Sequence, residues 1–429
     1  MASHPRERRQ SSLSRREFLR NSAFAGAALS VGGSAFLAAC GSSGSKSGAS
    51  GGTGKVGGCG QPPKLSRQND PATLPLCSTA IKDGLDPETG ATLKIFNYAD
   101  YVGPDMVKAF EDKYHCKVSI TTFDSMDDAV SKIQANTASF DITNISPDRI
   151  GSLVATENLQ PINHSYIPNL TNVWPSLQSP FYDTGARYSV PYTLYTTGIG
   201  YRVDKIDAAD DPFKLKDGTD LLYNPKYKGK VSVLDDDREA LSMALLRLGN
   251  TNVNTEDAKE IKAAGAELNK LIDLVNVKVD IQDYTMLPEG SSWVHQAWGG
   301  DMINAVADLP KGVPASVLGY WFQPDGKGLI QNDMMAIPKN SKNPVLAHLF
   351  LNFFLDSTNA LLNFNGIGYQ QPLNDLPPES FISKGLVPEN LKTALVKPSD
   401  FDHAFEELQL SPAGDRLWQA QWRQFTSGG

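Results

Sequence analysis

The chain has 429 residues, of which 40% are apolar, and a formal net charge of −8. This length favours two or three domains, and the ordinary composition excludes whole-chain disorder, collagen and coiled coil. Residues 1–39 hold six Arg and two Glu, so the remainder carries 34 basic and 46 acidic side chains, a net charge of −12. Such a body repels a phosphate backbone and attracts small cations, which argues against nucleic-acid binding.

The first forty residues have the pattern of an export signal. Ser14–Leu19 (SRREFL) resembles the twin-arginine motif, and the apolar stretch from Ala23 to Leu37 fits the apolar region of a signal peptide. Leu37–Cys40 (LAAC) resembles a bacterial lipoprotein box, which implies cleavage before Cys40 and lipidation of its thiol. A plain secretory signal with an unrelated cysteine is the alternative. We expect a signal peptide at 1–39, a lipidated Cys40 with a flexible Gly/Ser linker at 40–58, and a body anchored to the outer face of the bacterial cytoplasmic membrane.

Export places the other three cysteines in an oxidising compartment. Cys59 and Cys77 bracket a proline-rich segment, so a disulfide between them would fasten an extension at 59–91. Free thiols, or pairing with Cys116, are the alternatives. Cys116 lies in a predicted strand, where a buried thiol behaves as a small apolar side chain. The sequence has no Cys/His pattern with the spacing of zinc ligands, and we expect neither a metal nor another cofactor.

The body alternates strands and helices. In its first region we expect strands at 93–98, 118–122 and 140–145, with helices that begin at Pro104 and near Met126. This β-α-β-α-β order is typical of an α/β layer with a parallel sheet.

A second region of the same kind follows. We expect a strand at 229–234, a helix through Leu241 and Leu248, a long helix at 261–275 capped by Asn254 or Thr255, a strand at 302–306 and an apolar helix from Pro344. Two α/β lobes with a cleft between them are the natural packing of this pattern. The six histidines lie far apart, and no zinc-protease, nucleophile-elbow or phosphate-loop motif supports an enzyme. A binding protein is favoured over an exported hydrolase with an unrecognised site.

From Leu93 to the C-terminus the chain resembles the extracytoplasmic substrate-binding proteins of ABC importers, especially the branch that binds spermidine and putrescine. The resemblance rests on the order and spacing of FNYADYV at 96–102, FDI at 140–142 with Ser146, YSVPY at 188–192, LDDDRE at 234–239 with SMAL at 242–245 and LG at 248–249, DMMAIP at 333–338 and GIGY at 366–369. It implies a two-lobed fold that closes on its ligand like a hinge, with lobe I at 92–197 plus 331–376 and lobe II at 198–330 plus 377–429. It also implies delivery to a membrane permease with a cytoplasmic ATPase, without chemistry. We expect a monomer.

The resemblance places ligand-binding carboxylates at Asp100, Asp236, Glu239 and Asp333. Asp236 and Glu239 match the D-x-x-E that faces the amines in this family, and Asp333, after a predicted crossover strand, aligns with the acid that holds a terminal ammonium. Asp100 stands where a glutamate is usual. The structural alternative for the first pair is helix capping, for which we expect Asp235 or Asp237 to serve instead. The alternative for Asp333 is an acid in a surface turn, and the alternative for Asp100 is an acid in the loop that leads into a helix.

Aromatic walls for the ligand are implied at Tyr98, Tyr101, Trp298 and Tyr369, where rings would contact methylenes and cations. Trp298 is alternatively a core aromatic, and Ser146 would hydrogen-bond the ligand. The chain departs from the family at Gln331, where a second tryptophan is usual, and at Asp148, where an aromatic is usual. These departures leave arginine-like, choline-like, longer polyamine or amino-acid-like ligands open, whereas the acids disfavour an anion.

Overall fold

The computed structural model describes residues 58–136 and 138–428, and these belong to one compact unit. The predicted signal peptide, Cys40 and most of the linker lie outside the described residues. Within the described part, no single helix has the length and apolar character needed to cross a bilayer. One pair of helices, Pro344–Phe353 and Ser357–Ile367, reaches that length and apolar character together, but the two are bent by 86° relative to each other.

One mixed sheet organises the described residues. The strand order is β2-β1-β3-β9-β4-β7-β5-β6, and β8 pairs with β4 outside this path. The strands are β1 (Thr92–Tyr98), β2 (Lys117–Phe123), β3 (Ile142–Ile145), β4 (Ser189–Arg202), β5 (Val231–Val233), β6 (Lys278–Val279), β7 (Val294–Trp298), β8 (Leu318–Trp321) and β9 (Leu329–Ala336).

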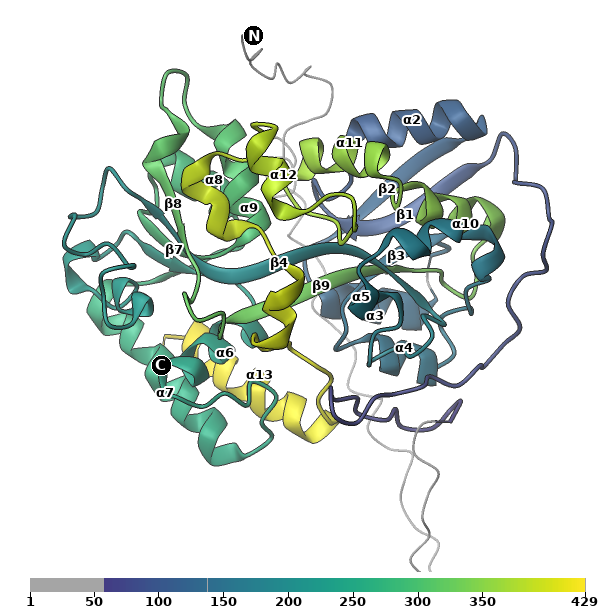
Figure 1. The fold of residues 1–429 in the computed structure, drawn as a ribbon. Coiled ribbons are helices and arrows are strands. Elements are labelled where there is room, and N and C mark those ends of the chain that lie inside the picture. Colours follow the sequence, from purple (N-terminus) through teal and green to yellow (C-terminus); the bar gives the residue numbers. More distant parts are fainter. Residues whose placement is uncertain (1–57, 137, 429) are drawn as a thin grey trace, which may run out of the picture. The chain divides into compact units, whose positions relative to one another are not determined.

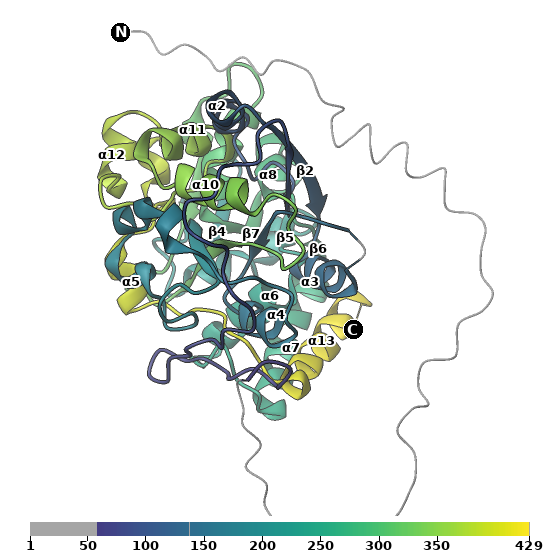
Figure 2. The same cartoon turned by 90° about the vertical axis from the view of Figure 1, so that its right-hand side faces the viewer.

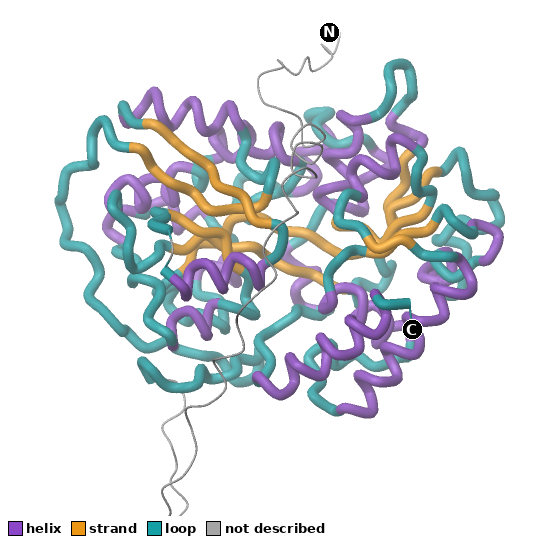
Figure 3. The backbone as a smooth tube through the Cα atoms, turned by 180° about the vertical axis from the view of Figure 1, so that it is seen from behind, coloured by secondary structure: helices purple, strands orange, loops and turns teal. Residues whose placement is uncertain are grey.

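The sheet has a parallel group at each end. β1 pairs in parallel with β2 and β3, and β5 pairs in parallel with β6 and β7. Two long strands, β4 and β9, connect the groups and run side by side across the middle of the sheet (Figure 1). β4 pairs with β9 over Ser189–Thr197 and then with β7 and β8. Helices pack around both groups (Figure 3), as parallel strands require, and the predicted α/β fold is confirmed.

Helices supply the apolar faces that cover the sheet. In the second group α6, α7 and α13 pack against one another, and α7 and α13 lie side by side (Figure 2). Trp418 of α13 is fully buried in that core, whereas in the first group Phe96 stacks on Phe140 with ring centroids 4.2 Å apart. The α-helices are α2 (Pro104–Tyr114), α3 (Met126–Ala135), α4 (Ile150–Ala155), α5 (Pro175–Gln178), α6 (Asp237–Arg247), α7 (Ala258–Val275), α8 (Asp283–Glu289), α9 (Gly299–Asn304), α10 (Pro344–Phe353), α11 (Ser357–Ile367), α12 (Pro378–Ser383) and α13 (Pro412–Thr426).

Two predictions about elements are wrong. Residues 302–306 lie in α9 and the 3-10 helix η5 (Ala305–Asp308), because a short buried apolar run has no periodicity that separates a strand from a helix. Helix α7 is capped by Asp257, whose carboxylate accepts a hydrogen bond from the backbone N–H of Lys259 at 2.7 Å. Asn254 instead donates to the carbonyl of Glu406, so its side chain is used elsewhere.

The extension at 59–91 lies against the body. Cys59 and Cys77 are joined by a disulfide, and Cys116 is a buried free thiol. The backbone N–H of Ala72 donates to the carbonyl of Phe181 at 2.7 Å. Further along, the Glu88 carboxylate accepts hydrogen bonds from two backbone N–H groups in the first turn of α10. The N-cap residue of α10, Asn343, makes no capping bond with its side chain, so Glu88 takes that role. The extension is therefore hydrogen-bonded both to the loop that precedes β4 and to a helix end.

Candidate functional site

Several expected site residues lie where parallel strands end. β1 ends at Tyr98 and β7 at Trp298, while Ser146 directly follows β3 and Asp236 follows β5 by three residues. In open α/β sheets the carboxyl ends of the strands are where ligands bind. Both Asp236 and Asp333 raise the pKa of the Tyr98 phenol, although burial is the larger cause. The strand ends of the two groups therefore lie within electrostatic reach of one another.

Asp333 lies inside a connecting strand. The sequence predicts a position after such a strand, but Asp333 occupies the middle of β9, opposite Thr193 of β4. β9 is buried along its whole length, so polar residues within it mark a site and not a turn. The Tyr101 hydroxyl donates to Asp333 Oδ2 at 3.0 Å and lies 2.6 Å from Thr193 Oγ1. Burial raises the pKa of Asp333 to about 7, and Asp148 adds to this effect, whereas the hydrogen bond from Tyr101 opposes it.

Glu239 forms the second buried carboxyl group. The indole Nε1–H of Trp298 donates to Glu239 Oε1 at 2.8 Å, and Glu239 Oε2 has no hydrogen-bond donor among the described residues. Burial raises the pKa of Glu239, and the neighbouring Asp236 raises it further. A buried carboxyl oxygen without a donor is costly unless a ligand supplies one.

Asp236 caps helix α6. Its Oδ1 accepts hydrogen bonds from the backbone N–H groups of Arg238 and Glu239 at 2.9 and 3.1 Å. The expectation that Asp235 or Asp237 caps this helix is therefore wrong: Asp236 is the last residue with extended backbone before the helix begins at Asp237. Burial nevertheless raises the pKa of Asp236, because the two capping bonds offset only part of its desolvation.

A run of aromatic rings connects the two carboxyl groups. Tyr101 contacts Tyr98 and Tyr369 edge to face, with ring centroids 5.9 and 4.8 Å apart. Tyr195 of β4 continues the run, 6.0 Å from Tyr369 and 6.1 Å from Trp298. The Tyr101 hydroxyl bonds Asp333 and the Trp298 indole bonds Glu239. The rings therefore offer apolar faces between two acidic ends.

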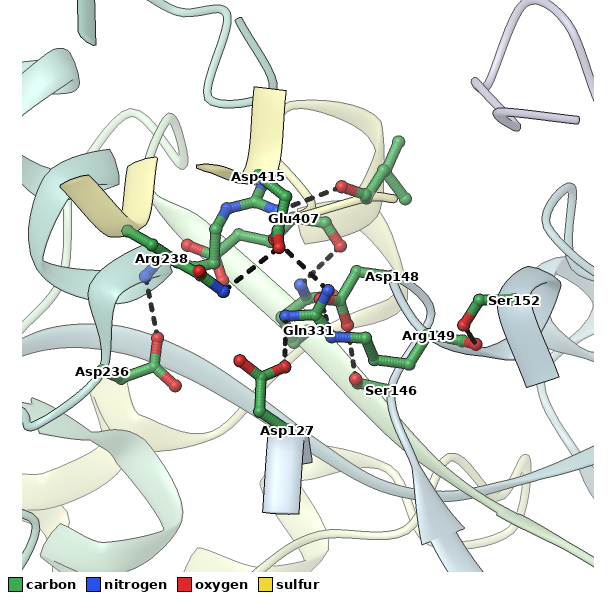
Figure 4. Close-up of polar contacts among 12 residues, drawn as sticks. Asp127, Ser146, Asp148, Arg149, Ser152, Asp236, Arg238, Gln331, Glu407 and Asp415 are labelled. Atoms are coloured by element: carbon green, nitrogen blue, oxygen red, sulfur yellow. Dashed lines mark hydrogen bonds and ion pairs between the residues drawn. The ribbon is translucent and has the colours of Figure 1, made fainter. Parts of the chain in front are cut away.

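Ser146 and Asp148 are engaged with each other and with Arg149. Ser146 Oγ donates to Asp148 Oδ1, and Arg149 Nε lies 3.3 Å from Asp148 Oδ2. The Arg149 guanidinium also contacts Asp127 of α3 at 2.8 Å and Asp415 of α13 at 3.5 Å (Figure 4). Asp148 thus has a cationic partner of its own.

Two further expected site residues, Asp100 and Gln331, have surroundings of their own. Asp100 is exposed, with left-handed backbone at φ 55°, and none of the described residues forms a hydrogen bond or ion pair with it. Gln331 is buried, and its Nε2 donates to the backbone carbonyl of Glu407 at 2.8 Å while its Oε1 has no donor among the described residues.

Sequence reasoning missed several residues of this region. The hydroxyl of Thr193 is hydrogen-bonded to the Tyr101 hydroxyl, and Asp301 accepts a hydrogen bond from the Tyr369 hydroxyl at 2.8 Å. Glu407 is buried, and burial raises its pKa. The contact of Arg149 with Asp148 could have been predicted, because the two residues are adjacent in the sequence. Its other partners, Asp127 and Asp415, come from helices far away in the sequence. Among the described residues, no three His, Cys, Asp or Glu side chains are grouped to hold a metal ion.

Comparisons with known proteins agree with one another. Residues 105–385 match a family model described as bacterial extracellular solute-binding protein. The putrescine/cadaverine-binding protein of Pseudomonas aeruginosa is 28% identical over 332 residues, covering 76% of this chain and 93% of that protein. The spermidine/putrescine-binding periplasmic protein of Escherichia coli is 31% identical over 284 residues, covering 66% and 77%. A solved spermidine/putrescine ABC transporter substrate-binding protein from Streptococcus pneumoniae shares the fold, with TM-score 0.63, 24% identity and coverage of 79% and 99%.

Proposed function

Because this chain belongs to the bacterial extracellular solute-binding proteins, we propose that it captures a polyamine outside the cytoplasmic membrane and delivers it to an ABC permease. One observation carries the proposal: Asp333 and Glu239 are buried carboxyl groups, and no Lys or Arg among the described residues forms an ion pair with either. A ligand with an ammonium at each end would supply both missing charges. Relatives named for binding putrescine, cadaverine and spermidine support this ligand class.

The mechanism is capture without chemistry. Asp333 holds one ammonium and Glu239, with Asp236 beside it, holds the other, while Trp298 and the tyrosine rings cover the methylenes. Each charge-assisted hydrogen bond contributes about 1.5–3 kcal/mol, and each cation–π contact contributes about 0.5–2 kcal/mol. Micromolar binding corresponds to about 8 kcal/mol. The acidic body draws the cation in, less so at high salt.

We also propose that β4 and β9 join two lobes. The bounds are those expected from the sequence, except that the last boundary follows α12 instead of residue 377. Phe381 of α12 packs on Phe364 of α11 with ring centroids 4.5 Å apart, whereas Asn390 beyond it donates to the carbonyl of Leu318 in β8. Hinge movement about the connecting strands would then bring Asp333 and Glu239 onto the same ligand.

Export and anchoring form a separate part of the proposal. Twin arginines at Arg15 and Arg16 direct folded export, and lipidation of Cys40 holds the body at the outer face of the membrane. We expect Cys40→Ser to move the protein from the membrane fraction to the soluble extracytoplasmic fraction, as followed by immunoblot. We expect Arg15→Lys with Arg16→Lys to retain it inside the cell. Membrane retention of the Cys40→Ser protein would overturn the lipid anchor.

Calorimetric titration of the purified full chain in detergent tests ligand capture. We expect saturable micromolar binding of putrescine or spermidine, and weaker binding of arginine. Asp333→Asn and Glu239→Gln should each weaken amine binding about tenfold or more, since each removes a charge-assisted bond. Asp86→Asn is the matched control, because Asp86 is an exposed carboxylate in the extension. The absence of heat with every amine would overturn the proposed function.

A further inference from the structure

We propose that Asp283 and Asp301 form a pair of carboxyl groups that shares one proton and holds two of the ligand-binding rings in place. The rings are those of Trp298 and Tyr369. This inference rests on the proposed function, and it assigns positioning residues that lie behind the rings. Both carboxyl groups are buried, and neither has a part in the capture mechanism described above.

The two carboxyl groups come from neighbouring helices. Asp283 is the first residue of α8 and Asp301 the third of α9, and these helices pack against each other (Figure 1). A side chain at the third position of a helix can reach back to the backbone N–H of the N-cap residue, which in α9 is Trp298. That N–H donates to Asp283 Oδ2 at 3.2 Å. Asp301 therefore lies beside the carboxyl group of Asp283, to which it is hydrogen-bonded.

A hydrogen bond between two carboxyl groups requires a proton between them, because ionised carboxylates only accept. Asp283 is fully buried, and Asp301 is 8% exposed. Burial raises the pKa of Asp283, and the neighbouring charge of Asp301 raises it further. Hydrogen bonds from the backbone N–H groups of Tyr284 and Trp298 oppose this rise. The pair therefore carries about one negative charge at neutral pH, as closely spaced carboxyl groups do.

Asp301 fixes the ring of Tyr369. The Tyr369 hydroxyl donates to Asp301 Oδ1 at 2.8 Å. At its other end the ring lies against Gly300, where it occupies the place that a Cβ atom would take. Tyr369 also contacts the rings of Tyr101 and Tyr195, with centroids 4.8 and 6.0 Å away. The place of Tyr369 in the aromatic run therefore depends on the hydrogen bond to Asp301 and on the contact with Gly300.

Asp283 fixes the backbone that carries Trp298. Its Oδ1 accepts from the backbone N–H of Tyr284 at 3.0 Å, and its Oδ2 accepts from that of Trp298. The Trp298 indole in turn donates to Glu239. Because both oxygens of Asp283 accept from backbone N–H groups, an amide NH2 group at position 283 would face a backbone donor. At position 301 an amide can accept from Tyr369 and donate to Asp283, as a protonated carboxyl group does. The two positions should therefore tolerate an amide differently.

The test measures amine binding to the full chain in detergent by calorimetry at pH 8. The probe is putrescine or spermidine, whichever the unaltered protein binds more tightly. Asp301→Asn keeps both hydrogen bonds of the side chain and should weaken binding by no more than about threefold. Asp301→Val removes both bonds at similar volume and should weaken binding about tenfold, as should Asp283→Asn. Asp273→Asn alters an exposed carboxylate of α7 and should leave the affinity unchanged.

Two further measurements separate positioning from a general loss of structure. In a Tyr369→Phe background, Asp301→Val should weaken binding much less than in the unaltered protein, because the hydrogen bond through which Asp301 acts is already absent. Infrared difference spectra at pH 8 should show that Asp301→Asn loses the carbonyl band of one protonated carboxyl group. If Asp301→Val does not fold, the infrared spectra of Asp301→Asn decide the matter.

The outcomes distinguish this inference from the proposed function. An equal effect of Asp301→Val in the two backgrounds, or an unchanged carbonyl band in Asp301→Asn, overturns the inference alone. Failure of the unaltered protein to bind either amine overturns the proposed function and the inference with it.

Discussion

At the scale of single residues, burial of Asp333 has a cost that a cation would offset. Burial raises the pKa of its carboxyl to about 7 in the folded chain, above the usual value near 3.8. The unfolded chain therefore releases this proton at lower pH than the folded chain does. The contribution of Asp333 to the free energy of unfolding is therefore fully present below about pH 4 and is lost as the pH rises toward 7. Above that range the loss is on the order of 4 kcal/mol, from about 1.4 kcal/mol per pKa unit.

Asp333→Asn should therefore raise stability and lower function together. The amide keeps the shape of the side chain and can still accept a hydrogen bond from Tyr101, but it carries no charge to desolvate. We expect a melting temperature a few degrees above that of the unaltered protein at pH 8, and a smaller difference at pH 5. Putrescine should stabilise the unaltered protein but not the variant in the same melting assay. A variant that melts lower at pH 8 would contradict this assignment.

The pKa of Asp333 also predicts that binding releases a proton. An ammonium favours the ionised carboxylate, so affinity should rise from pH 6 to pH 8 as Asp333 loses its proton, while aliphatic amines stay charged. Calorimetry in two buffers of different ionisation enthalpy measures the protons released. We expect release near pH 6.5, to which Asp333 contributes most, and a further contribution near pH 8 from Glu239, whose pKa is raised to about 8. In Asp333→Asn the release should fall, and equal release in both proteins would assign it to other groups.

At the scale of elements, the start of α6 serves the helix and the site at once. Asp236 caps the helix through Oδ1, and its charge acts on Glu239 one turn later. Asn caps a helix about as well as Asp, whereas Ala costs about 1 kcal/mol. The two roles can therefore be separated by choice of substitution.

Asp236→Asn should weaken putrescine binding without lowering the melting temperature. Asp236→Ala should lower both, because it also leaves the N–H groups of Arg238 and Glu239 without their acceptor. Calorimetry and thermal melting of the two variants side by side check this. Equal affinity of the Asn variant and the unaltered protein would restrict Asp236 to capping.

The disulfide-closed extension is a second element with a separable role. Cys59 and Cys77 are 18 residues apart, and closing a loop of about that length contributes about 3 kcal/mol. Joint Cys59→Ser and Cys77→Ser substitution should lower the melting temperature and open residues 60–76 to limited proteolysis. Putrescine affinity should not change, since the described contacts of this segment lie outside the aromatic run and its two carboxyl groups. Unchanged protease resistance would contradict a fastening role.

At the scale of the whole molecule, the sequence predicted the α/β layers because local periodicity marks strands and helices. The same local signals failed at 302–306, where a buried apolar run fits either element. Several expected site residues lie together because the strand order brings the carboxyl ends of the parallel strands to one region. The ion pairs of Arg149, in contrast, could not be predicted from the sequence. Its partner Asp415 is 266 residues away, and only packing of α13 places it there. The prediction that Asp235 or Asp237 caps α6 is wrong because any of three consecutive aspartates can cap a helix, and the sequence alone does not indicate which one does.

The central claim is that Asp333 and Glu239 hold the two ends of one organic cation. A crystal structure of the protein with putrescine bound tests this most directly. We expect one ammonium nitrogen about 2.7–3.0 Å from the Asp333 carboxylate, the other at the same distance from the Glu239 carboxylate, and the methylenes in contact with Trp298. Putrescine bound elsewhere, or bound in this site with neither carboxylate in contact, would contradict it.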